Sequence, residues 1–277
     1  MLFLQNISAG YAGRLVLQDI AVNIAAGEFV GLIGPNGSGK TTLLRVVSGV
    51  LPAWQGEVWL GGRKLREMGR RDVARRVAHL LQDCALGLAF SVRELVLMGR
   101  SPHLPRFGRE TERDLAIVER AMDAASVSHL ADRPITAISG GERQRALIAM
   151  CLAQEPQVLL LDEPTSHLDI GHQLSILNLI RNLNRQTPMT VVAVLHDLNL
   201  AAEFCDRLVL LDRGRVVAAG APVDVLTAEM ILNVYGVRVV IGRNPVSDAP
   251  HTVLAASGCP EPLFWADRII GQRGGRQ

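Results

Sequence analysis

Residues 34–41, Gly34-Pro35-Asn36-Gly37-Ser38-Gly39-Lys40-Thr41, form a phosphate loop of the pattern G-x-x-x-x-G-K-[ST]. Its glycines let successive backbone amides turn towards a phosphate group, and the N-terminus of a following helix adds about half a positive charge. Lys40 is expected to reach the β and γ phosphates of a nucleotide, and Thr41 to hold a magnesium ion. The alternative, a glycine-rich turn that binds nothing, is disfavoured because a predicted strand precedes the loop and a predicted helix follows it.

Two carboxylates, Asp162 and Glu163, follow the apolar run 159–161 and supply what a hydrolytic site still needs. Ligands of open α/β sheets bind beyond the carboxyl ends of the strands, so this pair is expected to face the phosphate loop. Asp162 would serve the metal ion and Glu163 the attacking water. Acidic residues after a strand are common on protein surfaces, so this interpretation depends on the phosphate loop.

The tetrapeptide Ser139-Gly140-Gly141-Glu142 opens a predicted helix and has two interpretations. Serine at the N-cap with glutamate three residues later is an ordinary capping box and needs no ligand. The glycine pair, however, gives up helix propensity of about 1 kcal/mol per residue and bares the backbone amides to an anion. The pair therefore favours a second phosphate-binding segment.

Three single residues stand at the ends of predicted elements. Gln82 follows a predicted strand at 77–81, His196 follows one at 190–195, and Tyr11 lies in a predicted turn. Each residue taken alone favours a structural role, as a satisfied polar group or a turn aromatic. Their order along the chain, relative to the motifs above, points instead to a common site.

The elements that must position these residues follow from the spacing of apolar side chains. Segments 2–8 and 17–24 alternate like strands, 29–33 is a short apolar run, and helical spacing begins at Thr41. Segments 158–161 and 190–195 are apolar throughout, as central strands of a parallel sheet are, and a helical stripe lies between them. The order β, α, β indicates an α/β fold.

Helical patterns dominate from about residue 91 to 153, where we predict helices at 91–98, 111–124 and 141–154. A hairpin is predicted from 208–211 and 216–219, which flank Asp212, Arg213 and Gly214. Segments 237–241 and 252–255 form a further candidate strand pair, which would brace a dimer or cover the core; we favour the core. Residues 271–277 are rich in glycine and arginine and are predicted to be disordered.

Composition excludes several classes of protein. The length of 277 residues suits one domain with an insertion or tail, and the four cysteines form no Cys-x-x-Cys pair, against a zinc site or a disulfide framework and in favour of a reducing cytoplasm. No signal peptide or apolar run of about 20 residues is present. A net charge of +2 lacks the basic field typical of nucleic-acid binding. The 48% hydrophobic content fits a buried parallel sheet, a surface that docks on another protein, or both.

Taken together, these motifs resemble the nucleotide-binding subunit of ATP-binding cassette (ABC) transporters, over about residues 2–226. The resemblance implies a P-loop NTPase (RecA-like) core with an antiparallel β subdomain and a helical subdomain inserted at about 84–155. It divides the chain into an ATP-binding domain at 1–226, a C-terminal extension at 227–270 and the tail at 271–277. The departures are small, with Ile138 in place of the commoner leucine and Arg143 as a frequent variant.

The resemblance also assigns roles for ATP and Mg²⁺. Tyr11 would stack on adenine, Gln82 would contact magnesium and sense the membrane partner, and His196 would hold the γ-phosphate beside Glu163. The segment 139–142 would close on the ATP of a second subunit, with Asp169 contacting across the interface. The implied catalytic residues are Lys40, Glu163 and His196; the metal ligands are Thr41, Gln82 and Asp162; and the nucleotide-binding residues are Tyr11, Gly34, Pro35, Asn36, Gly37, Ser38, Gly39, Lys40, Thr41, Thr42, Gln82, Ser139, Gly140, Gly141, Glu142 and Asp169.

Segments 91–100 and 165–170, with Pro102-His103, look like those of importers of ferric siderophores, haem and cobalamin. This implies a head-to-tail dimer of two copies, two integral-membrane permease subunits and, indirectly, a substrate-binding protein, at the cytoplasmic face of the inner membrane. No nucleic-acid partner is implied. The alternative for 99–109 is a solvated loop.

Three other functions remain open: an ABC ATPase for another transport substrate, a non-transport ABC ATPase of ribosomes or DNA repair, and a phosphate-loop kinase. A single cassette without heptads between Lys40 and Ser139 disfavours the ribosomal and repair ATPases. The segment 139–142 disfavours the kinase.

Overall fold

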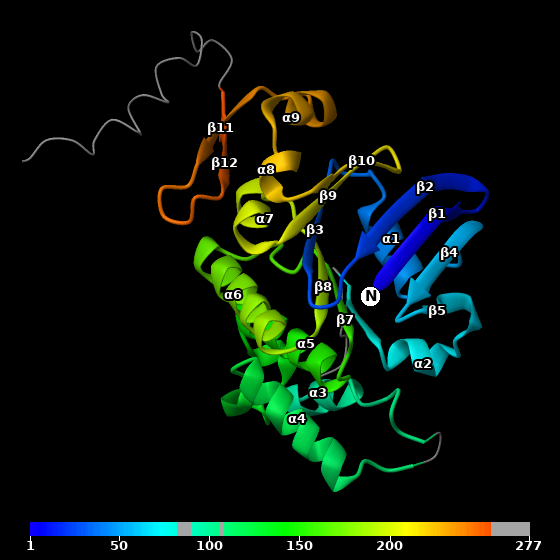
Figure 1. Ribbon diagram of the computed structural model, residues 1–277. Helices are drawn as coiled ribbons and strands as arrows, with labels where there is room; N and C mark the ends of the chain where they lie inside the picture. Colours follow the sequence, from blue (N-terminus) through cyan, green and yellow to red (C-terminus); the bar gives the residue numbers. More distant parts are fainter. Residues whose placement is uncertain (82–89, 106–107, 256–277) are drawn as a thin grey trace, which may run out of the picture.

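The computed structural model describes residues 1–81, 90–105 and 108–255 (Figure 1). Gln82 and the predicted tail at 271–277 lie outside the described residues. Among the residues described, no helix combines the length and the apolar character that crossing a bilayer requires.

A six-stranded sheet forms the centre of the molecule, with the order β10-β9-β3-β8-β7-β6. All neighbouring strands are parallel except β9 and β10, which form the predicted antiparallel hairpin. The strands are β3 (Phe29–Ile33), β6 (Val77–Leu80), β7 (Val158–Asp162), β8 (Thr190–Val194), β9 (Arg207–Asp212) and β10 (Arg215–Gly220). The predicted α/β class and the predicted central strands are confirmed.

Both faces of the central strands are covered, which explains why their sequences are apolar without alternation. In β7, Val158 and Leu160 belong to one hydrophobic core, while Leu159 and Leu161 belong to the other. Successive side chains of a strand point to opposite faces, so one five-residue strand supplies both cores. The carboxyl ends of β7 and β8 are thereby held rigidly.

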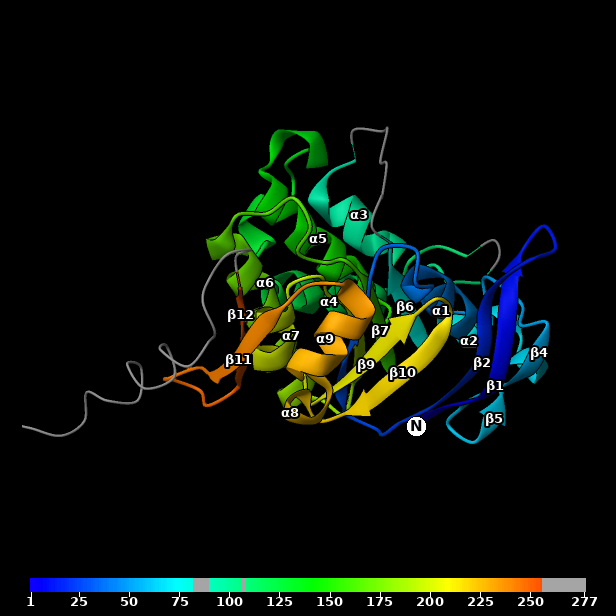
Figure 2. The ribbon, with the colours of Figure 1, turned by 90° about the horizontal axis from the view of Figure 1, so that it is seen from above.

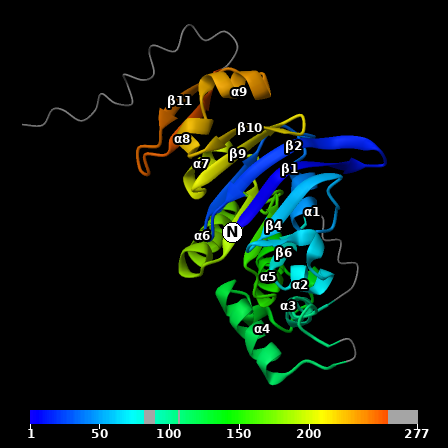
Figure 3. The ribbon, with the colours of Figure 1, turned by 45° about the vertical axis from the view of Figure 1, so that its right-hand side comes forward.

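An antiparallel sheet covers one face, with α1 (Lys40–Val47) packed between it and the central sheet (Figures 1 and 3). Its order is β2-β1-β4-β5. Its strands are β1 (Leu2–Tyr11), β2 (Arg14–Ile24), β4 (Gln55–Leu60) and β5 (Arg63–Lys64), followed by the short helices η1 (Leu65–Glu67) and α2 (Arg70–Ala74).

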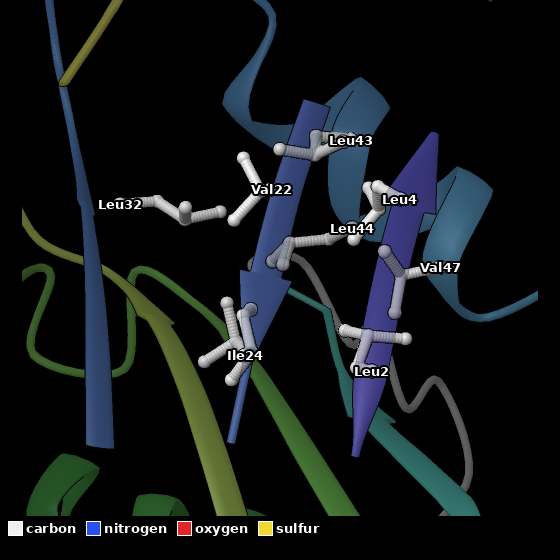
Figure 4. Close-up of a pocket in the computed structure, with 9 residues that line it drawn as sticks. Leu2, Leu4, Val22, Ile24, Leu32, Leu43, Leu44 and Val47 are labelled. Atoms are coloured by element: carbon white, nitrogen blue, oxygen red, sulfur yellow. The ribbon is translucent and has the colours of Figure 1, made fainter. Parts of the chain in front are cut away.

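A small cavity of about 10 Å³ remains between α1 and this sheet (Figure 4). Nine apolar side chains line it: Leu2, Leu4, Val22, Ile24, Leu32, Leu43, Leu44, Val47 and Val192. A buried water needs two to four polar partners, which these side chains do not offer. The cavity is therefore a packing gap and not a ligand site.

The predicted helices after residue 91 are confirmed, and they lie at the opposite end of the molecule from residues 228–254 (Figures 1 and 3). Each of the three longer ones begins with a capping box, at Ser91, Thr111 and Ser139. The helices are α3 (Val92–Met98), α4 (Glu112–Ala124), η2 (Ser128–Leu130), η3 (Ile135–Ala137) and α5 (Gly140–Ala153).

The segment after α3 is docked rather than solvated. Arg100 is buried, and its Nε donates to Asp114 Oδ1 at 3.0 Å while its Nη1 donates to Ala153 O at 2.7 Å and to Glu155 Oε2 at 2.9 Å. His103 Nε2 lies 2.9 Å from the carbonyl oxygen of Gln154. For these residues the alternative of a solvated loop at 99–109 is wrong.

The other face of the central sheet is covered by α6 (Ile170–Gln186), which the apolar stripe predicts, and by α7 (Leu198–Phe204), which we did not predict. Two short helices, α8 (Pro222–Val225) and α9 (Ala228–Tyr235), pack on the same core. The predicted strand pair is confirmed as β11 (Val239–Arg243) and β12 (Pro250–Leu254), which lie beside α7 (Figure 2).

Candidate functional site

The phosphate loop lies between β3 and α1, as predicted, and two of its glycines are required by their surroundings. Gly34 has φ 144°, and a Cβ there would lie 2.1 Å from Leu211 O. Gly39, the N-cap of α1, has φ 105°, and its Cβ would lie 2.7 Å from Leu17 Cδ2. Other residues fit neither the left-handed backbone nor the space.

Lys40 is buried beneath the loop. Its Nζ donates to the carbonyl oxygens of Gly34 at 2.8 Å and Pro35 at 2.9 Å. Burial lowers the pKa of Lys40, and the nearby carboxylates of Glu163 and Asp162 oppose this shift. The ammonium group is thus held by the loop itself, in the place where phosphate oxygens would compete for it.

Within the part of the chain that the structure describes, the buried hydroxyl of Ser38 has no hydrogen-bond partner. A buried polar atom without a partner costs free energy, so this hydroxyl is a polar group that a ligand or a small movement of the loop could satisfy. The loop therefore offers both a cation and a free polar group to an anion.

Asp162 ends β7 and meets Thr41 from α1, whose Oγ1 donates to Asp162 Oδ1 at 3.1 Å. Burial raises the pKa of Asp162, an effect that the hydrogen bond from Thr41 opposes. A hydroxyl and a buried carboxylate are ligands that Mg²⁺ prefers when phosphates and waters complete its shell. The described residues contain no group of three or more His, Cys, Asp and Glu side chains that could hold a metal unaided.

Glu163 and His196 lie at the ends of the neighbouring strands β7 and β8 and meet there. His196 Nε2 is 2.7 Å from Glu163 Oε1. Glu163 has φ 53°, an uncommon backbone conformation for a residue with a side chain, and its side chain is mostly shielded. A shielded carboxylate beside an imidazole can accept a proton from water, so the pair suits hydrolysis.

Tyr11 is the last residue of β1 and so precedes the turn in which we placed it. Arg45 from α1 donates from Nη1 to the Tyr11 hydroxyl at 3.1 Å and lies 5.9 Å from the ring centroid. The ring is partly exposed beside the helix that follows the phosphate loop. Arg45 was missed because no local pattern links it to Tyr11.

The segment 139–142 forms the capping box that one interpretation predicted. Ser139 Oγ donates to Glu142 Oε2 at 2.8 Å, and Glu142 N donates to Ser139 Oγ at 3.3 Å. A Cβ on Gly141 would lie 2.2 Å from His172 Cδ2, so the imidazole covers this glycine. Asp169 caps α6 and contacts His172 Nδ1 at 2.9 Å.

Two clusters thus emerge. The structure connects the phosphate loop with Thr41 and Asp162, and Glu163 with His196, while the segment 139–142 is connected with Asp169 through His172. His172 was missed because its role depends on a glycine distant in sequence. The roles of all these residues stay predictions.

Comparisons with known proteins agree with this geometry. A family model described as ABC transporter matches residues 17–166. The chain is 44% identical over 249 residues to the ferric enterobactin transport ATP-binding protein FepC of Escherichia coli (strain K12), covering 90% of this chain and 92% of that protein. It is 45% identical over 244 residues to the hemin import ATP-binding protein HmuV of Rhodococcus jostii (strain RHA1), covering 88% of this chain and 82% of that protein.

Among solved structures, a chain described as belonging to a metal-chelate type ABC transporter in an inward-facing conformation has a TM-score of 0.81 at 29% identity. The match covers 92% of this chain and 97% of that one. This likeness confirms the predicted fold class.

Proposed function

The chain belongs to the ABC transporter family, and we propose that it is the ATP-binding and ATP-hydrolysing subunit of an importer for a metal chelate. The observation that carries the proposal is the contact of 2.7 Å between Glu163 and His196, beside the phosphate loop. This pair supplies the proton acceptor that a phosphate cradle alone lacks.

In this proposal each described residue of the first cluster has a task. Lys40 exchanges its bonds to the loop carbonyls for bonds to phosphate oxygens. Thr41 and Asp162 would hold Mg²⁺, which would supply charge neutralisation at the phosphates. Glu163 accepts the proton of the attacking water, and His196 holds the γ-phosphate side of the site. Tyr11 offers its ring to the adenine.

Among the described residues, the hydrogen bonds of the second cluster lie within the cluster and do not reach the phosphate loop of the same chain. We propose that residues 139–142 and Asp169 act on the ATP bound by a second copy, in a head-to-tail dimer. Hydrolysis would then depend on dimer closure, because each site takes its anion-binding helix end from the other chain. Gln82, outside the described residues, keeps its proposed roles at magnesium and the membrane partner.

The proposed cargo is a ferric siderophore, haem or cobalamin. It rests on relatives whose names specify ferric enterobactin and hemin and which align over most of this chain. Two permease subunits in the inner membrane and a substrate-binding protein would complete the importer, with this chain on the cytoplasmic face. The cargo would not touch this chain.

Uptake of labelled ferric siderophores, haem and cobalamin, by cells that lack this gene, tests the proposal. Complementation with the wild type should restore uptake of one cargo, while Glu163→Gln should not. Glu67→Gln makes the same chemical change at an exposed carboxylate and should behave as the wild type. If no cargo responds to the wild type, the metal-chelate assignment fails and another transport substrate or a non-transport role takes its place.

A further inference from the structure

Residues 227–255, here called the brace, contact both segments that carry the hydrolytic residues. The brace contains α9 and the β11–β12 pair, which lies beside α7 (Figure 2). One contact reaches the helix that follows His196, and another reaches the phosphate loop. Both contacts are polar, so they do more than cover the apolar core.

The first contact is a pair of hydrogen bonds between the Asn199 side chain and the main chain of Thr252. Asn199 Oδ1 accepts from Thr252 N at 2.7 Å, and Asn199 Nδ2 donates to Thr252 O at 3.2 Å. Asn199 lies three residues after His196, and its own amide donates to the N-cap Asp197 at 2.8 Å. These hydrogen bonds therefore link the segment that follows His196 to β12.

A second set of hydrogen bonds to the brace lies one helical turn further along α7. Glu203 Oε2 accepts from Asn244 Nδ2 at 3.3 Å and from Ser247 Oγ at 2.5 Å. Residues four apart share one face of a helix, so Asn199 and Glu203 together hold that face against the brace.

Helix α7 needs such support because it spans only Leu198–Phe204. Isolated helices shorter than about 12 residues are marginal in water, so tertiary contacts must fix this one. His196 directly precedes its N-cap, Asp197, so a shift of α7 would be passed through one residue to the backbone that carries the imidazole.

The other contact is made by Tyr235, the last residue of α9. Burial raises the pKa of Tyr235 to about 12, and the nearby backbone amide of Gly34 opposes this shift. Since the carbonyl of the same Gly34 accepts from Lys40, the brace reaches the first residue of the phosphate loop.

We propose that the brace is a positioning element for ATP hydrolysis. In this proposal Asn199 fixes the position of His196, and Tyr235 fixes the position of the phosphate loop. The inference rests on the proposed function, since it assigns a role within that same site. Asn199 and Tyr235 are positioning residues that act through His196 and Gly34.

ATPase kinetics of the purified full chain test this. Asn199→Ala should lower kcat about tenfold, because a small misplacement of a catalytic group is costly, while KM for Mg-ATP and the melting temperature stay at wild-type values. Asn199→Asp keeps the acceptor for Thr252 N but turns a second acceptor towards Thr252 O, so it should recover kcat only in part. The matched control is Asn233→Ala, the same change at an exposed position of α9, which should leave kcat unchanged.

A second variant keeps the inference testable if Asn199→Ala does not fold. Tyr235→Phe should raise KM for Mg-ATP about three- to tenfold, the loss expected for one hydrogen bond, at an unchanged melting temperature. Wild-type kinetics in both variants, or losses that only follow a lowered melting temperature, would overturn the positioning role. A wild-type chain without any ATPase activity would instead overturn the proposed function itself.

Discussion

Asp162 and Glu163 are adjacent carboxylates that the backbone directs to different environments. Asp162 ends its strand buried and bonded to Thr41, whereas Glu163 turns through φ 53° to meet His196. A change of backbone conformation between neighbours thus separates the proposed metal ligand from the proposed proton acceptor.

His79 is a second residue whose environment sets its protonation. It lies in β6, its Nδ1 is 3.2 Å from Ser48 Oγ, and its Nε2 has no hydrogen-bond partner among the described residues. Burial, helped by the charge of Arg45, lowers the pKa of His79 to about 4. The unfolded chain therefore binds an extra proton between that pH and the ordinary value near 6.5.

We predict that the free energy of unfolding falls as the pH drops through this window, by about 2 kcal/mol from pH 7 to pH 5 on account of His79. The contribution of His79 to the free energy of unfolding is complete above its pKa in the unfolded chain. It decreases as the pH falls towards the pKa of His79 in the folded chain. Urea unfolding at both pH values measures this, with His79→Gln as the comparison. An equal pH dependence in the variant would show that His79 does not titrate in this way.

At the scale of elements, the buried side chain of Arg100 joins α3, α4 and the end of α5. Hydrogen bonds from Thr111 and the contact with Arg100 lower the pKa of Asp114 to about 2, so the carboxylate is charged at neutral pH. Arg100 and Asp114 are both buried, so each neutralises the charge of the other. Glu155, the second acidic partner of Arg100, is half-exposed and can be solvated by water.

Arg100→Ala should lower the free energy of unfolding by about 3–5 kcal/mol, because it leaves Asp114 buried without its cation. Arg66→Ala removes an exposed ion pair with Glu57 and should cost less than about 1 kcal/mol. Chemical denaturation of both variants at pH 7 measures the difference. Equal losses would mean that the Arg100 network is no stronger than a surface pair.

The helix end at Ser139 is the second element with a testable role. Ser139→Arg should abolish hydrolysis and leave ATP affinity at the wild-type value, because the residue is proposed to act on the nucleotide of another chain. Titration calorimetry and phosphate release measure the two quantities. Ser91→Arg, which disrupts the same capping box on α3, controls for helix capping alone. Loss of ATP binding in Ser139→Arg would contradict the action in trans.

At the scale of the whole molecule, the two clusters on one chain predict a nucleotide-dependent dimer. Glu163→Gln should bind Mg-ATP without turning it over and accumulate as a stable dimer. Size-exclusion chromatography with and without Mg-ATP measures this, and Glu163→Gln combined with Ser139→Arg should stay monomeric. A monomer of Glu163→Gln at high protein and Mg-ATP concentrations would refute the head-to-tail arrangement.

Much of this organisation could be predicted from the sequence, because strand and loop motifs are local. Local sequence is enough to recognise the apolar runs of β7 and β8 and the glycines of the phosphate loop. Helix α7 was missed because it is short and, unlike the equally short α3, does not begin with a capping box that marks its start in the sequence. Arg100 and His172 escaped prediction since their roles depend on partners far away in sequence. The division at residue 226 stays a prediction.

The hydrogen bonds of Lys40 to Gly34 and Pro35 have a thermodynamic consequence. Nucleotide binding at this loop is an exchange reaction, in which phosphate oxygens must outcompete two backbone carbonyls that already solvate the ammonium group. The measured affinity is then a difference between two well-satisfied states. An anion that contacts only the ammonium group gains little from such an exchange, so a polyphosphate chain, which also reaches the backbone amides along the loop, is expected to bind more tightly than free inorganic phosphate.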